Sequence, residues 1–193
     1  MKFIGFYDYT VILTYLSLAS AFVGMSFAHQ GHFTAAVICL FFSGFCDAFD
    51  GTVARTKKNR TEDEKAFGIQ LDSLCDVVSF GIFPAFLLHC MGVKGPLGMV
   101  ILCFYCICGV IRLGFFNVME AKRQQVETGC GKEYRGLPIT SMSMILPLVY
   151  LLRLILPGKV FRWLLYILPA LVGFLFILDF RVKKPNLAKL FSK

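Results

Sequence analysis

Apolar residues recur along nearly the whole chain in runs about as long as a membrane is thick. A helix needs about 20 residues to cross a hydrocarbon core of roughly 30 Å. Runs of this length fit helices better than the alternating strands of a membrane barrel. The pattern predicts six transmembrane helices, the last two of them short, at residues 9–28, 33–54, 67–88, 97–118, 137–152 and 163–178.

The composition agrees with an integral membrane protein, since 57% of the 193 residues are hydrophobic. We expect an all-α fold, a six-helix bundle that forms one domain over residues 1–193. Residues 1–8 (MKFIGFYD) mix aromatic, apolar and charged side chains, which is typical of a short interfacial segment. A cleavable signal peptide is not expected, because the first run is long enough to span and five more follow it.

The formal net charge of +8 is distributed unevenly along the chain. Basic residues gather in the second and fourth connections and in the tail, and the positive-inside rule then places both termini in the cytoplasm. Arg153, Lys159 and Arg162 oppose the rule but are fewer. We therefore predict a multi-pass protein of the cell (plasma) membrane whose basic face also attracts anionic membrane lipids. Nucleic-acid binding is excluded, because no soluble basic domain is present.

Eight cysteines do not indicate a disulfide framework, because most lie in apolar runs, where cysteine behaves as a small hydrophobe. Cys103 and Cys106 form a C-x-x-C pair inside a predicted span. No second pair or histidine lies near them in the sequence, so a zinc or redox role is not expected.

Two acidic faces interrupt the second and third apolar runs. At 100° per residue, Asp47 and Asp50 share one polar or small-residue face with Gly51 and Ala54, and Arg55 lies at its edge. The next run repeats the pattern with a second face, which consists of Gly68, Asp72, Asp76 and Ser79. The two faces can meet.

Carboxylates placed together near a membrane repel one another and resist desolvation unless cations neutralise them. Oxygen ligands without histidine or thiolate favour Mg²⁺ or Mn²⁺ over zinc. An EF-hand is excluded, because the twelfth position counted from Asp47 is Lys58. Glycines that allow close backbone approach, with Arg55 nearby, suit a diphosphate ligand.

Other polar residues in the spans have simpler interpretations. Hydroxyls such as Thr14 and Ser17 are expected to bond back to the preceding helical turn. Pro84 should bend or open the third helix about two turns beyond Asp76. Arg112 either extends its side chain to the membrane interface or holds a phosphate or carboxylate, with Asn117 lining the same cavity. The fourth connection, residues 121–140, is a candidate lid.

The motif Asp47-x-x-Asp50-Gly51-x-x-Ala54-Arg55, followed by Gly68-x-x-x-Asp72-x-x-x-Asp76, resembles the signature of the CDP-alcohol phosphatidyltransferases. The resemblance implies a six-helix homodimer that binds two divalent cations and a CDP-linked lipid. It implies the following roles: metal binding by Asp47, Asp50, Asp72 and Asp76, proton abstraction by Asp76, and contact with CDP by Gly51, Ala54, Arg55 and Gly68. Thr10 stands where the family often has a hydroxyl near the nucleotide.

Within that family, the stretch FGIQLDSLCDVVSFGIFPA is similar to bacterial and archaeal phosphatidylserine synthases, as are RLGFFN and YRGLPI. This likeness implies transfer of a phosphatidyl group from CDP-diacylglycerol to L-serine. Phe115 departs from the branch, which usually has arginine there, so glycerol 3-phosphate and an inositol phosphate stay open as acceptors. An intramembrane prenyltransferase fits less well, because it needs more spans. A cation-coupled transporter would place its carboxylates nearer the midplane.

Overall fold

The computed structural model describes residues 5–6, 9–54, 57, 61–125 and 134–182. Its main helices are α1 (Ile12–His29), α2 (Phe33–Ala54), α3 (Glu62–Asp76), α4 (Phe83–Met91), α5 (Gly95–Gln125), α6 (Met142–Leu151) and α7 (Gly158–Ile177). Short 3-10 turns, η1 (Tyr9–Val11), η3 (Ile139–Ser141) and η4 (Leu152–Leu154), flank α1 and α6, and the π-helical turn η2 (Val77–Ile82) joins α3 to α4. Two short strands, β1 (Tyr134–Arg135) and β2 (Arg181–Val182), pair antiparallel.

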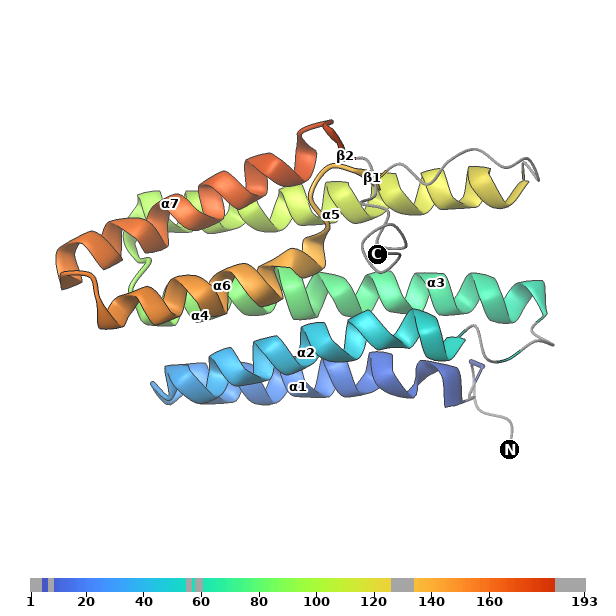
Figure 1. Ribbon diagram of the computed structural model, residues 1–193, viewed down its shortest axis with the longest axis horizontal. Coiled ribbons are helices and arrows are strands. Elements are labelled where there is room, and N and C mark those ends of the chain that lie inside the picture. Colours follow the sequence, from blue (N-terminus) through green and yellow to red (C-terminus); the bar gives the residue numbers. More distant parts are fainter. Residues whose placement is uncertain (1–4, 7–8, 55–56, 58–60, 126–133, 183–193) are drawn as a thin grey trace, which may run out of the picture.

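The helices form an elongated bundle in which α1 packs on α2 and α5 packs on α7 (Figure 1). The turns that join α1 to α2, α4 to α5 and α6 to α7 lie at one end of the bundle. The end of α2, the start of α3 and the end of α5 lie at the other. This alternation is the arrangement expected of a chain that crosses a membrane back and forth.

Among the described residues, five helical segments are long and apolar enough to span a membrane, and Ile139–Leu154 is a shorter apolar helix. The six predicted apolar segments are therefore all helical. The last was predicted too short, because α7 begins at Gly158 and runs for 20 residues. With 31 residues, α5 is about 46 Å long and so exceeds a hydrocarbon core of roughly 30 Å.

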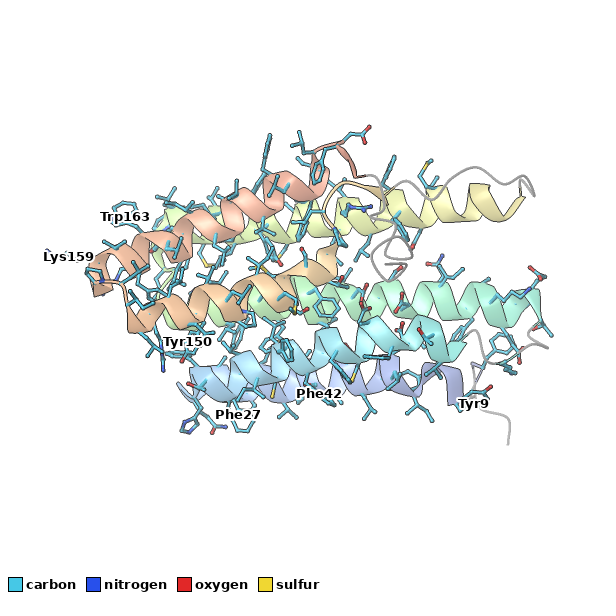
Figure 2. All side chains as sticks on the ribbon, in the orientation of Figure 1. Tyr9, Phe27, Phe42, Tyr150, Lys159 and Trp163 are labelled. Atoms are coloured by element: carbon cyan, nitrogen blue, oxygen red, sulfur yellow. The ribbon has the colours of Figure 1, made fainter. Side chains whose placement is uncertain are left out.

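Interfacial side chains mark both ends of the bundle. Trp163 and Lys159 lie at the end where α6 turns into α7, and Tyr9 lies at the opposite end (Figure 2). Aromatic and basic side chains favour the two membrane interfaces. Thr61 begins α3 with a capping box that it shares with Glu64, and the first turn of α3 is acidic.

Small residues bring the helices close together. A side chain on Gly24 would collide with Phe83, and one on Gly44 would collide with Ser143. A Cβ on Gly173 would lie 3.1 Å from the Tyr105 Cα atom. In a membrane, helix association depends on such close packing. These contacts fix α2 against α6 and α5 against α7.

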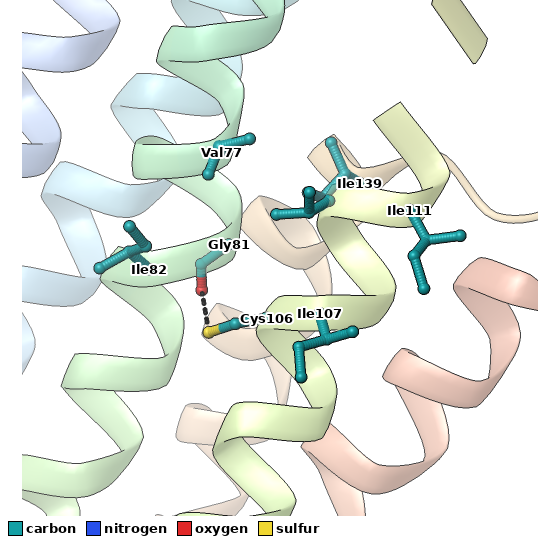
Figure 3. Close-up of a pocket in the computed structure, with 8 residues that line it drawn as sticks. Val77, Gly81, Ile82, Cys106, Ile107, Ile111 and Ile139 are labelled. Atoms are coloured by element: carbon teal, nitrogen blue, oxygen red, sulfur yellow. Dashed lines mark hydrogen bonds between the residues drawn. The ribbon is translucent and has the colours of Figure 1, made fainter. Parts of the chain in front are cut away.

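The third span is one helical segment, Glu62–Met91, that changes register at η2. Pro84 follows η2 in the first turn of α4, so the predicted opening of the helix is confirmed. An apolar cavity of about 280 Å³ lies between η2 and α5 (Figure 3). The seven described cysteines are free, and the sequence did not indicate a disulfide framework.

Candidate functional site

The two acidic faces meet where the last turns of α2 lie beside α3. One carboxylate oxygen from each of Asp47, Asp50 and Asp72 lies within 4.8 Å of the other two. All three side chains are half-buried. Three acidic ligands at this spacing can share a cation, which would offset their mutual repulsion.

Asp76 is the most deeply placed of the four predicted aspartates. It lies one helical turn beyond Asp72, and only 8% of its surface is exposed. Its carboxyl group lies beside that of Asp47 and close to that of Asp72. The structure therefore gathers all four aspartates, with Asp76 at the buried side of the group.

One carboxylate oxygen without a hydrogen-bond partner indicates whether this group of aspartates suits a metal ion. The Oδ1 atom of Asp72 is buried and has no hydrogen-bond partner among the described residues. A buried acceptor without a partner is costly, and a bound hard cation would satisfy it. The donor set around it consists of carboxylate oxygens, since the three residues grouped at metal-binding distance are all aspartates. The site fits Mg²⁺ or Mn²⁺ better than zinc.

The hydroxyls of α1 connect helices, so the prediction that they bond within α1 was wrong for two of them. Thr14 Oγ1 donates to Asp50 Oδ2 at 3.3 Å. Ser17 Oγ donates to the Ser43 carbonyl at 3.2 Å and to Ser79 Oγ at 3.5 Å. These partners lie on α2 and η2. The periodicity of one helix does not indicate which residues of other helices its side chains contact. Thr14 is thus a site residue that the sequence reasoning missed.

The predicted nucleotide contacts are described to different extents. Gly51 is exposed, and a Cβ added there would meet no atom within 4 Å. Gly68 is half-buried on α3. Ala54 ends α2 and Thr10 lies in η1, on the same side of the bundle. Arg55 lies outside the described residues, as do residues 126–133 of the candidate lid. Open space over Gly51 leaves room for a ligand at the end of α2.

Arg112 is buried, and its side chain makes contacts within the protein. Its Nε donates to the Leu137 carbonyl at 3.1 Å, and its guanidinium carbon lies 5.3 Å from the centre of the Phe116 ring. It also lines a cavity of about 220 Å³ between α5 and α7. Asn117 instead accepts a hydrogen bond from Ser73 Oγ at 2.9 Å. Arg112 lines this cavity, whereas Asn117 is not among the described residues that line it.

Comparison with known proteins gives consistent relatives. CDP-diacylglycerol–serine O-phosphatidyltransferase of Saccharomyces cerevisiae is 39% identical over 113 residues, which cover 57% of this chain and 40% of that protein. Archaetidylserine synthase of Methanothermobacter thermautotrophicus is 33% identical over 148 residues, 72% of this chain and 56% of that protein. CDP-diacylglycerol–serine O-phosphatidyltransferase of Methanocaldococcus jannaschii is 31% identical over 145 residues, which cover 75% of this chain and 60% of that protein.

These matches span about half the length of the relatives. No solved structure matches the chain significantly. The family model for CDP-alcohol phosphatidyltransferase matches residues 9–176, which include the carboxylate group and every described membrane helix except the last residue of α7. The chain therefore belongs to the CDP-alcohol phosphatidyltransferase family.

Proposed function

We propose that this chain transfers the phosphatidyl group of CDP-diacylglycerol to the hydroxyl of L-serine, which yields phosphatidylserine and CMP. The observation that carries the proposal is the meeting of Asp47, Asp50 and Asp72 within 4.8 Å at the end of α2. Two relatives that are named for this reaction support the choice of donor and acceptor. Residues 1–193 form the single domain in which it takes place.

Asp47, Asp50, Asp72 and Asp76 hold two divalent cations, Mg²⁺ or Mn²⁺. Bound cations of this kind polarise a phosphoryl group and stabilise a leaving phosphate. The unpartnered Oδ1 of Asp72 supports its assignment as a ligand. Chelation with EDTA should abolish turnover, and Mg²⁺ or Mn²⁺ should restore it.

The remaining predicted residues bind the donor. The backbones at Gly51 and Gly68 let the nucleotide approach closely, and Ala54 and Thr10 border it. Arg55 pairs with diphosphate oxygens, and Arg112 holds an anionic group of donor or acceptor. The open space at Gly51 supports the first of these roles.

The site faces the cytoplasm of a cell whose plasma membrane holds the protein as a homodimer. The basic second and fourth connections support this orientation. The described parts of those connections lie at the same end of the bundle as the end of α2, the helix that carries Asp47 and Asp50.

Asp76 takes the proton from the serine hydroxyl as that oxygen attacks the β-phosphorus of the diphosphate that carries the diacylglycerol, and CMP leaves. Its burial next to the other carboxylates supports this role. Replacing Asp76→Asn should lower kcat by about 10²- to 10⁴-fold, because positioned general bases contribute that much. Binding of CDP-diacylglycerol, measured separately with the purified protein, should largely persist. Undiminished turnover in the variant would exclude the proton-acceptor role.

An acceptor panel tests the reaction itself. Purified protein with CDP-diacylglycerol should release CMP when L-serine is added, and should release little with glycerol 3-phosphate or an inositol phosphate. Phe115, which replaces an arginine typical of the branch, makes this panel the decisive test of the acceptor. CMP release driven by glycerol 3-phosphate and not by serine would overturn the proposal.

A further inference from the structure

The third span changes register directly after Asp76. The N–H of Phe83 bonds to the carbonyl of Val78, five residues back instead of four. Such a π turn holds one extra residue, so it rotates the helix before it relative to the helix after it by about 100°. The direction in which Asp76 points therefore depends on this turn.

Two side chains of α5 hydrogen-bond to carbonyls of the turn, one of which lacks its usual donor. Pro84 has no N–H, so the Phe80 carbonyl lacks the donor that an α-helix would supply. The Tyr105 hydroxyl donates to that carbonyl at 2.5 Å. The next residue, Cys106, places its Sγ 3.7 Å from the Gly81 carbonyl (Figure 3). Two consecutive side chains of α5 thus bind two consecutive carbonyls of η2.

The hydrogen bond from Tyr105 to the Phe80 carbonyl lies in a buried, apolar environment. Tyr105 and Phe80 are both fully buried. Except for Gly81 and the thiol of Cys106, the residues that line the neighbouring cavity are valine and isoleucine, as Figure 3 shows. A carbonyl that has no hydrogen-bond donor in such an apolar environment raises the free energy of the fold. A local rearrangement that gives it a new donor is then favoured. Loss of the hydroxyl would therefore weaken the register that η2 imposes.

We propose that Tyr105 is a positioning residue for the reaction proposed above: its hydroxyl holds η2 in the register that directs Asp76 toward Asp47 and Asp72. Tyr105 acts through the backbone of the third span and touches neither metal nor substrate. The role rests on the proposed function of Asp76. The apolar run around Tyr105 gives no hint of this role in the sequence.

The test compares two tyrosine hydroxyls. Tyr105→Phe in the full chain should weaken Mn²⁺ binding, followed by electron paramagnetic resonance of free Mn²⁺, by about fivefold or more and lower kcat by about tenfold or more. The KM for serine should change by less than about twofold, because the acceptor contacts persist. Tyr150→Phe is the matched control. It removes a hydroxyl that contacts Thr34 at 3.0 Å near the opposite end of the bundle (Figure 2), and should retain wild-type values.

A double-mutant cycle separates positioning from general destabilisation. In an Asp76→Asn background, Tyr105→Phe should cause no further loss of Mn²⁺ affinity, because the residue through which it acts is gone. An equal loss in both backgrounds, or wild-type Mn²⁺ affinity in Tyr105→Phe, would overturn the inference.

Cys106→Ala is the milder second variant, for use if Tyr105→Phe does not fold. It should weaken Mn²⁺ binding in the same direction by a smaller factor, and an unchanged affinity would then overturn the inference. If the wild-type chain releases no CMP, the proposed function fails instead. The Mn²⁺ comparison does not involve serine and still decides the positioning role.

Discussion

Thr14 shows how one hydroxyl can order a carboxylate. Its side chain is buried on α1, and its hydrogen bond to Asp50 Oδ2 fixes one oxygen of a half-buried carboxylate. The partners of groups that bind metals orient those groups and tune the affinity of the site. The first helix therefore contributes to the site although it carries none of the four aspartates.

Replacing Thr14→Val keeps the shape of the side chain and removes this donor. The concentration of Mg²⁺ that gives half-maximal activity should rise about tenfold, because loss of such a supporting contact typically costs 10- to 100-fold in metal affinity or activity. Titration of turnover against Mg²⁺ measures the change. Ser20→Ala is the control, since it removes a hydrogen bond of 2.9 Å from the same helix to the Cys39 carbonyl, away from the aspartates. An equal rise in both variants would contradict the role of Thr14.

Among the helices, the third span shows which features the sequence could and could not predict. Its existence followed from an apolar run, and its acidic face followed from the spacing of Asp72 and Asp76 at 100° per residue. Pro84 indicated where the helix opens. The register of η2 was not predictable, because it depends on hydroxyl and thiol groups that α5 supplies from about 25 residues away. Periodicity describes one helix at a time, so contacts between helices were missed here and at Thr14.

Two glycines of α2 have different environments, so substitutions at them can test helix packing and ligand contact separately. Gly44 touches Ser143 of α6, whereas the space above Gly51 is open. Gly44→Ala should lower stability by about 1–3 kcal/mol through overpacking, and should lower the unfolding temperature in detergent. Gly51→Ala should keep or raise that temperature, because alanine favours helix by about 1 kcal/mol over glycine. It should nevertheless raise the KM for CDP-diacylglycerol by about tenfold, because the added methyl group blocks close approach. Unchanged KM would place the nucleotide elsewhere.

At the scale of the whole molecule, the polar groups are concentrated toward one end. The carboxylate group lies at the end of α2, near the charged start of α3, where Lys57 pairs with Glu64 at 3.1 Å. The opposite end has short turns, including the one at Gly31. In the proposed reaction, a water-soluble acceptor enters and CMP leaves through one face of the membrane. The carboxylates lie toward one end of the bundle, so the orientation of the bundle decides which compartment would supply the proposed acceptor.

Charge predicts that orientation. The connections at the aspartate end are more basic than those at the end of Gly31, and basic connections stay in the cytoplasm. An epitope inserted at Gly31, where a Cβ would meet no atom within 4 Å, should bind antibody on spheroplasts of a bacterial host. An epitope after residue 193 should bind antibody only after permeabilisation. The reverse pattern would place the carboxylates on the outer face and would contradict the proposed cytoplasmic site. The same insertion at Gly158, the first residue of α7, should behave like the one at Gly31, because the turn that leads into α7 and the turn between α1 and α2 lie at the same end of the bundle.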